Sequence, residues 1–132
     1  MKKFLWVPVI LLAFFVLSCG GAGSGSVYNM TEYTTNSTGM QKIIDYIGSN
    51  GDLSTKSGMN SFEQWVVNNT SPQVNTTNSL SRKAVSDYLS ANPVYTQSTI
   101  NTLFVLIDSV GKYYAPIMTD GNEQYIIFIE KQ

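Results

Sequence analysis

The sequence contains no histidine and a single cysteine, and these two absences exclude several kinds of chemistry. Without histidine the chain lacks the commonest general base and the commonest metal ligand, and the familiar Ser-His-Asp triad cannot be assembled. One cysteine cannot form an intrachain disulfide, and a zinc site built from cysteine and histidine is excluded as well. We therefore expect a protein without catalytic residues, without a cofactor and without a bound metal.

Charged residues are also scarce, at 13% of the 132 residues. The 8 basic and 9 acidic residues are scattered, and after Lys2 and Lys3 no basic cluster remains to follow a phosphate backbone. This composition argues against a nucleic-acid partner. The polar surface must come from Ser, Thr, Asn and Gln, and such a neutral surface steers charged partners only weakly.

The first residues have the layout of an export signal. Lys2 and Lys3 precede Phe4–Leu17, an apolar run that only Pro8 interrupts. Its 14 residues are fewer than the ~20 needed to span a membrane, but they suit the apolar region of a signal peptide. We expect this segment to direct export and then to be removed.

The end of this segment carries a resemblance to a known class. Val16-Leu17-Ser18-Cys19 resembles the lipobox of bacterial lipoproteins, although the commonest pattern has leucine where this chain has Val16. The resemblance implies that the chain is cut before Cys19 and that palmitate or a similar acyl group anchors Cys19 in a membrane. Gly20 stands where aspartate often marks inner-membrane retention, so the resemblance favours the outer membrane. The same resemblance implies three parts: a cleaved signal (1–18), a lipidated cysteine with a flexible tether (19–36) and one small globular domain (37–132).

Three segments after the tether have apolar residues at helical spacing: Gly39–Gly48, Asn60–Asn68 and Asn78–Ala91. Ser98–Val110 also fits a helix that ends at Gly111, but its β-branched residues leave open the first strand of a meander. The residues expected to cap three of these helices are short and polar: Ser37 or Thr38, Asn60 and Ser98.

Strand patterns lie at both ends of this helical region. Val27–Thr38 is expected to be an extended arm or an edge strand. Lys112–Thr119 and Gln124–Lys131 flank an Asp-Gly turn and predict a hairpin, with Pro116 placing its first strand at an edge. Tyr125–Ile129 is almost continuously apolar and is expected to be buried on both faces. The expected fold class is α+β: three to four short helices followed by a C-terminal antiparallel β-hairpin or small meander.

Tyrosine is the abundant aromatic residue, and all eight tyrosines follow Cys19. Tyrosine is favoured where a surface is both apolar and hydrogen-bonding. Neighbouring strand residues point to opposite faces, so we expect at least one of Tyr113 and Tyr114 to be exposed and to bind a partner. The alternative is that the tyrosines are core aromatics whose hydroxyls reach water.

These features lead to two expectations about function. The first is an outer-membrane lipoprotein that binds a protein partner or acts as a surface antigen, without catalysis; in signal and composition the chain resembles small outer-membrane lipoproteins of the spirochaete type. The alternative is a periplasmic accessory protein or inhibitor that docks on an envelope complex by adding an edge strand such as Lys112–Thr119. An enzyme would need a concave pocket with perturbed carboxylates or a lysine.

Overall fold

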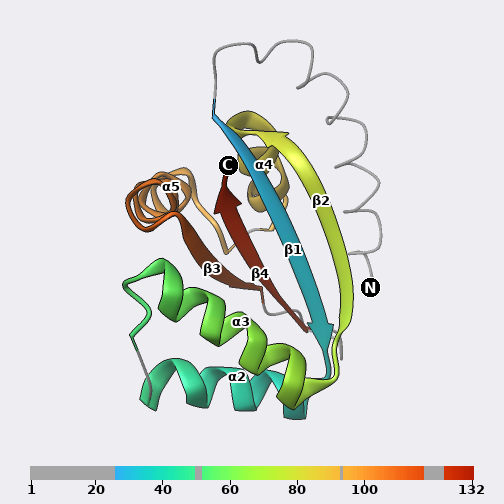
Figure 1. Cartoon of the computed structure of the whole chain (residues 1–132). Coiled ribbons are helices and arrows are strands. Elements are labelled where there is room, and N and C mark those ends of the chain that lie inside the picture. Colours follow the sequence, from blue (N-terminus) through green and yellow to red (C-terminus); the bar gives the residue numbers. More distant parts are fainter. Residues whose placement is uncertain (1–25, 50–51, 93, 118–123) are drawn as a thin grey trace.

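A computed structural model describes residues 26–49, 52–92, 94–117 and 124–132 and places them around one antiparallel sheet (Figure 1). The sheet order is β2-β1-β4-β3. The strands are β1 (Val27–Thr35), β2 (Gln73–Ser81), β3 (Lys112–Ile117) and β4 (Gln124–Lys131). The helices are α2 (Ser37–Ser49), α3 (Lys56–Thr70), α4 (Arg82–Ser90) and α5 (Gln97–Val110).

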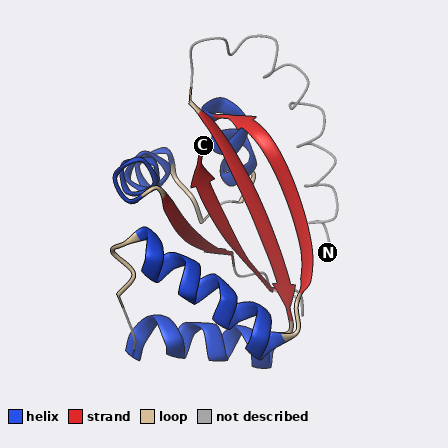
Figure 2. Cartoon of the chain, in the orientation of Figure 1, coloured by secondary structure: helices blue, strands red, loops and turns tan. Residues whose placement is uncertain are grey.

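Helices cover both faces of this sheet, which gives three layers (Figure 2). Strand β4 shows the consequence most clearly, because its side chains alternate between two hydrophobic clusters. Ile126 and Phe128 pack with residues of α2 and α3, whereas Ile127 and Ile129 pack with residues of α4 and α5. The prediction that Tyr125–Ile129 is buried on both faces is confirmed.

Residues 27–35, which were expected in a tether or at a sheet edge, instead form an inner strand. β1 lies between β2 and β4 and pairs with both. Tyr28 and Met30 are buried against α4 and α5, and Tyr33 is buried against α2 and α3. Both faces of β1 therefore contribute to the core, so the folded domain includes Val27–Thr35 as well as the residues from 37 onward.

The helices expected at Gly39–Gly48, Asn60–Asn68 and Ser98–Val110 are present as α2, α3 and α5, and the strand alternative for Ser98–Val110 is wrong. Gly111 ends α5 in the left-handed region with φ 99°, as glycine allows at low cost. The predicted caps were misplaced. Each helix is capped by a short polar residue upstream of the expected one. The side-chain oxygens that accept a backbone N–H belong to Asn36, Thr55 and Thr96.

The helix expected over Asn78–Ala91 is only half correct. Gln73–Ser81 forms β2, and α4 begins at Arg82. The Ser81 hydroxyl accepts the Ala84 N–H, so the chain changes from strand to helix at an N-cap. Within α4, Val85 and Leu89 are fully buried, as the helical spacing predicted.

The turn from β1 into α2 depends on a glycine. A Cβ atom at Gly39 would lie 2.0 Å from Thr35 Oγ1, a distance that real contacts do not reach. Thr35 is 8% exposed, and its hydroxyl has no hydrogen-bond partner among the described residues. Gly39 thus lets the first turn of α2 pack directly on the end of β1.

The C-terminal pair of strands is confirmed, since β3 and β4 are antiparallel neighbours. Its expected turn, Asp120–Glu123, lies outside the described residues. The α+β class is also confirmed, but the strands are interleaved with the helices and are not confined to the C-terminal end. The reason is that β1 pairs with β4 on the side opposite β3. An isolated hairpin of β3 and β4 would leave that side of β4 unpaired.

Candidate functional site

The two tyrosines expected to bind a partner, Tyr113 and Tyr114, lie on the edge strand β3, and both are partly buried. Their rings stack with centroids 4.9 Å apart, although neighbouring strand residues point to opposite faces. Tyr113 packs against both hydrophobic clusters, so its ring reaches around the edge of the sheet. Tyr114 also contacts Phe62 of α3, with ring centroids 5.5 Å apart. The pair therefore covers the outer side of β3 with aromatic rings.

The backbone of the same edge is closed at a second point. Pro116 has no N–H to donate, and the Tyr95 hydroxyl donates to the Pro116 carbonyl at 2.6 Å. Since β3 has only 6 residues, few outward groups are left for another strand. Within the described residues, the edge strand predicted at Lys112–Thr119 is present as Lys112–Ile117, and this edge is short and shielded.

Most other core tyrosines direct their hydroxyls to a defined acceptor. The Tyr28 hydroxyl donates to Asp108 at 3.0 Å, and the Tyr88 hydroxyl donates to Glu32 at 3.1 Å. The Tyr33 hydroxyl donates to Glu63. Burial, and then the neighbouring carboxylate, raises the pKa of each of these three tyrosines. Burial likewise raises the pKa of Tyr95 to about 12. Four of the eight tyrosines are thus buried or partly buried side chains whose hydroxyls donate within the fold.

These raised pKa values predict a loss of stability in alkali. A tyrosine with a higher pKa when folded stabilises the fold at pH values below its unfolded pKa of about 10, and this stability is lost as the pH rises through the folded value. We expect the buried tyrosines to stay protonated above pH 10 and then to ionise together as the domain unfolds. Absorbance at 295 nm and circular dichroism, followed together, would measure this. The urea-unfolded chain should titrate near pH 10, and a folded chain whose tyrosines all do so would contradict the prediction.

A buried ion pair lies beneath β3, on the side covered by α2 and α3. The Lys112 side chain is 9% exposed and pairs with Glu63 of α3, which is 17% exposed. Lys112 Nζ also donates to Asn60 Oδ1 at 2.8 Å and lies 4.0 Å from a Glu130 oxygen. The Tyr33 hydroxyl donates to the same carboxylate, so both buried charged groups have polar partners. This cluster fastens α3 to β1 and β3.

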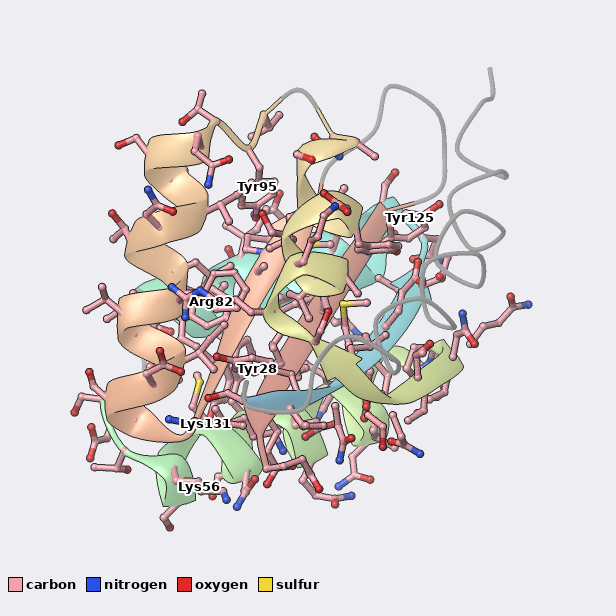
Figure 3. All side chains as sticks on the ribbon, turned by 90° about the horizontal axis from the view of Figure 1, so that it is seen from above. Tyr28, Lys56, Arg82, Tyr95, Tyr125 and Lys131 are labelled. Atoms are coloured by element: carbon pink, nitrogen blue, oxygen red, sulfur yellow. The ribbon has the colours of Figure 1, made fainter. Side chains whose placement is uncertain are left out.

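A second polar cluster lies where β1 begins and β4 ends. Asp108 accepts from Tyr28 and from Arg82 at 3.2 Å, and Lys131 lies 3.7 Å away. Arg82 also stacks over Phe104, 4.1 Å from the ring centre. Figure 3 places Tyr28, Arg82 and Lys131 close together in this region. The side chains of Arg82, Asp108 and Lys131 are at least about a third exposed, so their ion pairs add little to stability.

Cys19, the predicted lipidation site, precedes the described residues. Within the described ranges, no three His, Cys, Asp or Glu residues are grouped so as to hold a metal ion. No helix in the part of the chain that the structure describes is long and apolar enough to cross a membrane.

The other edge of the sheet, β2, is not predicted by the sequence patterns described above. Only Leu80 is buried in this strand, so it lacks the alternation that marks a half-buried strand. Its available signals were Pro72 directly before it and the β-prone residues Val74, Thr76 and Thr77.

No family model matches the chain, and no curated protein or solved structure matches it either.

Proposed function

We propose that the chain is the precursor of an envelope lipoprotein, exported by residues 1–18 and held in the outer membrane by lipid on Cys19. Its domain acts as a binding or antigenic protein and not as an enzyme. The observation that carries this proposal is the export signal ending in the lipobox-like Val16-Leu17-Ser18-Cys19.

The geometry of the domain supports an anchor at this position. β1 starts at Val27, where the Gln132 N–H donates to the Val27 carbonyl at 2.8 Å, so the first and last strands share one end of the sheet. The segment Gly20–Ser26 can extend to about 25 Å. A lipid on Cys19 can therefore enter a membrane while the folded domain remains outside the lipid. Two or more acyl chains anchor a protein stably, whereas one chain binds only marginally.

The buried ionisable groups support a role without catalysis. Lys112 and Glu63 are the ion pair that is most deeply buried among the described residues, and each is held by neighbours that fix its position. A catalytic lysine or carboxylate needs a side that is open to substrate. Here both groups are used to hold α3 on the sheet.

The second candidate function is an accessory lipoprotein that docks on an envelope complex inside the periplasm. A free sheet edge favours it, because an edge strand can accept a strand from another protein. Lys112–Thr119 is the edge expected to dock, but β3 is short and partly shielded, so the longer strand β2 is the better candidate for this docking.

Protease accessibility separates the two candidates. For a surface lipoprotein we expect the domain to be digested on intact cells, and for a periplasmic one only after the envelope is opened. A known periplasmic protein in the same cells serves as the control for envelope integrity. Protection of the domain on intact cells would rule out surface exposure and would leave the accessory function.

A further inference from the structure

Strand β2 is an open edge of the sheet. It has 9 residues, and its side chains from Gln73 to Thr76 are all exposed, with Val74 at 56%. Its neighbour on one side is β1, and no other described element pairs with it. An unpaired strand edge of this kind is a template for the addition of another strand.

The direction of the backbone groups in β2 follows from the ladder beside it. The Gln132 N–H donates to the Val27 carbonyl, so in β1 the groups of Val27 point toward β4. Backbone groups alternate in direction along a strand, so Glu32 and Thr34 point toward β2. Their partners Asn75 and Gln73 point back toward β1. It follows that the N–H and C=O groups of Val74 and Thr76 point outward.

The chemistry of this edge suits a second copy of the chain. Natural edge strands are commonly protected by charged residues or proline, and β2 (Gln-Val-Asn-Thr-Thr-Asn-Ser-Leu-Ser) has neither. When a strand pairs antiparallel with its own copy, the central residue lies opposite itself and its neighbours lie opposite one another, so like charges near the centre would repel. An uncharged edge of Thr, Asn and Gln avoids this repulsion and provides side chains that hydrogen-bond to one another.

The strand also has a defined limit. The register with β1 shifts between Tyr28 and Met30, and Ser79 has a positive φ of 59°, so β2 bulges there. A bulge twists the edge and interrupts regular pairing. The regular part of the edge is therefore Gln73–Thr77, whose centre is Asn75.

We propose that two copies of the chain associate through β2, antiparallel and centred on Asn75. In this register Val74 lies opposite Thr76 of the second copy, and both residues have outward backbone groups. Each such pair exchanges hydrogen bonds in both directions, and the two Asn75 residues meet at the two-fold axis as a pair without backbone hydrogen bonds. The two sheets become one continuous sheet. Because the contact is short, the dimer is weak and is favoured when copies are concentrated on a membrane. The dimer does not depend on lipid at Cys19, so its failure and the failure of the proposed function are distinguishable.

A cysteine at the axis tests the register directly. Opposite residues in a pair without backbone hydrogen bonds have Cα atoms about 4.5 Å apart, within the range that a disulfide bridges. Asn75→Cys in the full chain, oxidised in native membranes, should give a covalent dimer as the main species. The matched control is Val105→Cys on α5, which is 63% exposed and distant from β2 in the sequence. The unmodified chain, which contains Cys19, sets the background.

Introducing charges of either sign then distinguishes a loss of strand pairing from a loss of folding. Val74→Lys/Thr76→Lys places like charges opposite each other in the dimer, and Val74→Glu/Thr76→Glu does the same with the opposite sign. We expect each variant, purified in detergent, to associate about tenfold more weakly than the unmodified chain, and a mixture of the two to recover association. Sedimentation measures the mass, and recovery in the mixture shows that both variants are folded. Val74→Pro removes an outward N–H without adding a charge, so it should also weaken association. It is the variant to use if the charged chains do not fold.

Two results would overturn the proposal. One is a disulfide yield for Asn75→Cys no higher than for Val105→Cys. The other is that the Lys variant alone and the Glu variant alone, or Val74→Pro, associate as strongly as the unmodified chain. The contact would then lie elsewhere.

Discussion

Replacing Cys19 with alanine is expected to abolish lipid attachment and to remove the domain's acyl anchor. Cells fed labelled palmitate should label the unmodified chain and leave the Cys19→Ala chain at background. The reason is chemical, since the thiol of Cys19 is the only one in the sequence and the resemblance to lipoproteins places acylation there. Each buried methylene contributes ~0.8 kcal/mol to membrane binding, so the loss of two or more chains removes essentially all of the anchorage.

The control for this experiment is Ser18→Ala, which keeps a small residue before the cysteine and should leave labelling unchanged. Cys19→Ala also risks blocking removal of the apolar segment Phe4–Leu17, which would itself hold the chain at a membrane. A second variant therefore combines Cys19→Ala with the export signal of a soluble periplasmic protein, and its domain should appear in the soluble fraction. Palmitate labelling that persists in Cys19→Ala would contradict the lipoprotein proposal.

The helices were the most predictable part of the fold. Each of α2, α3 and α5 buries one apolar face on the sheet, so the residues that reach the core recur at helical spacing, as Ile100, Leu103, Phe104 and Ile107 do in α5. Their starts were harder to place. Several short polar residues stand before each helix, and any of them could cap it by the same hydrogen bond.

The outer strands were the least predictable. In β2 only Leu80 enters the core, so packing leaves almost no pattern in its sequence, and its conformation depends on hydrogen bonds to β1. β1 itself alternates between two buried faces, with Tyr28 on one and Tyr33 on the other. A strand covered on both sides does not show the apolar and polar alternation of a half-buried one. The inner position of β1 depends on its pairing with both β2 and β4, and the sequence of a single strand does not show it.

The candidate site could be predicted only in part. Pro116 correctly indicated that β3 lies at an edge, because proline cannot donate to a neighbouring strand. The closure of that edge could not be predicted, since Tyr95 lies 21 residues before Pro116 and reaches its carbonyl only in the folded chain. Nor could the spacing of Glu63 and Lys112 show that they form a buried ion pair. Such pairs join residues that are distant in the sequence, and no local pattern marks them.

Removing the ammonium group of this buried pair is expected to have the largest effect on stability. Lys112→Met keeps most of the side-chain volume but leaves the Glu63 carboxylate, which is 17% exposed, without its closest cation. Breaking a buried ion pair from one side costs about 3–5 kcal/mol, because a charge stays in a poorly solvated place. We expect the free energy of unfolding, measured by urea titration with Trp65 fluorescence as the probe, to fall by about this amount.

The double variant Lys112→Met/Glu63→Gln shows why the loss occurs. It removes both charges, and the new amide can still accept the Tyr33 hydrogen bond, so it should be more stable than Lys112→Met alone. The matched control is Lys83→Met, which breaks the Lys83–Asp87 pair at a lysine that is 80% exposed and should change stability by less than about 0.5 kcal/mol. If Lys112→Met cost no more than Lys83→Met, the ion pair would not hold α3 to the sheet. Lys112 and Glu63 would then not be needed for the fold, and the proposal of a domain that binds without catalysis would lose its main structural support.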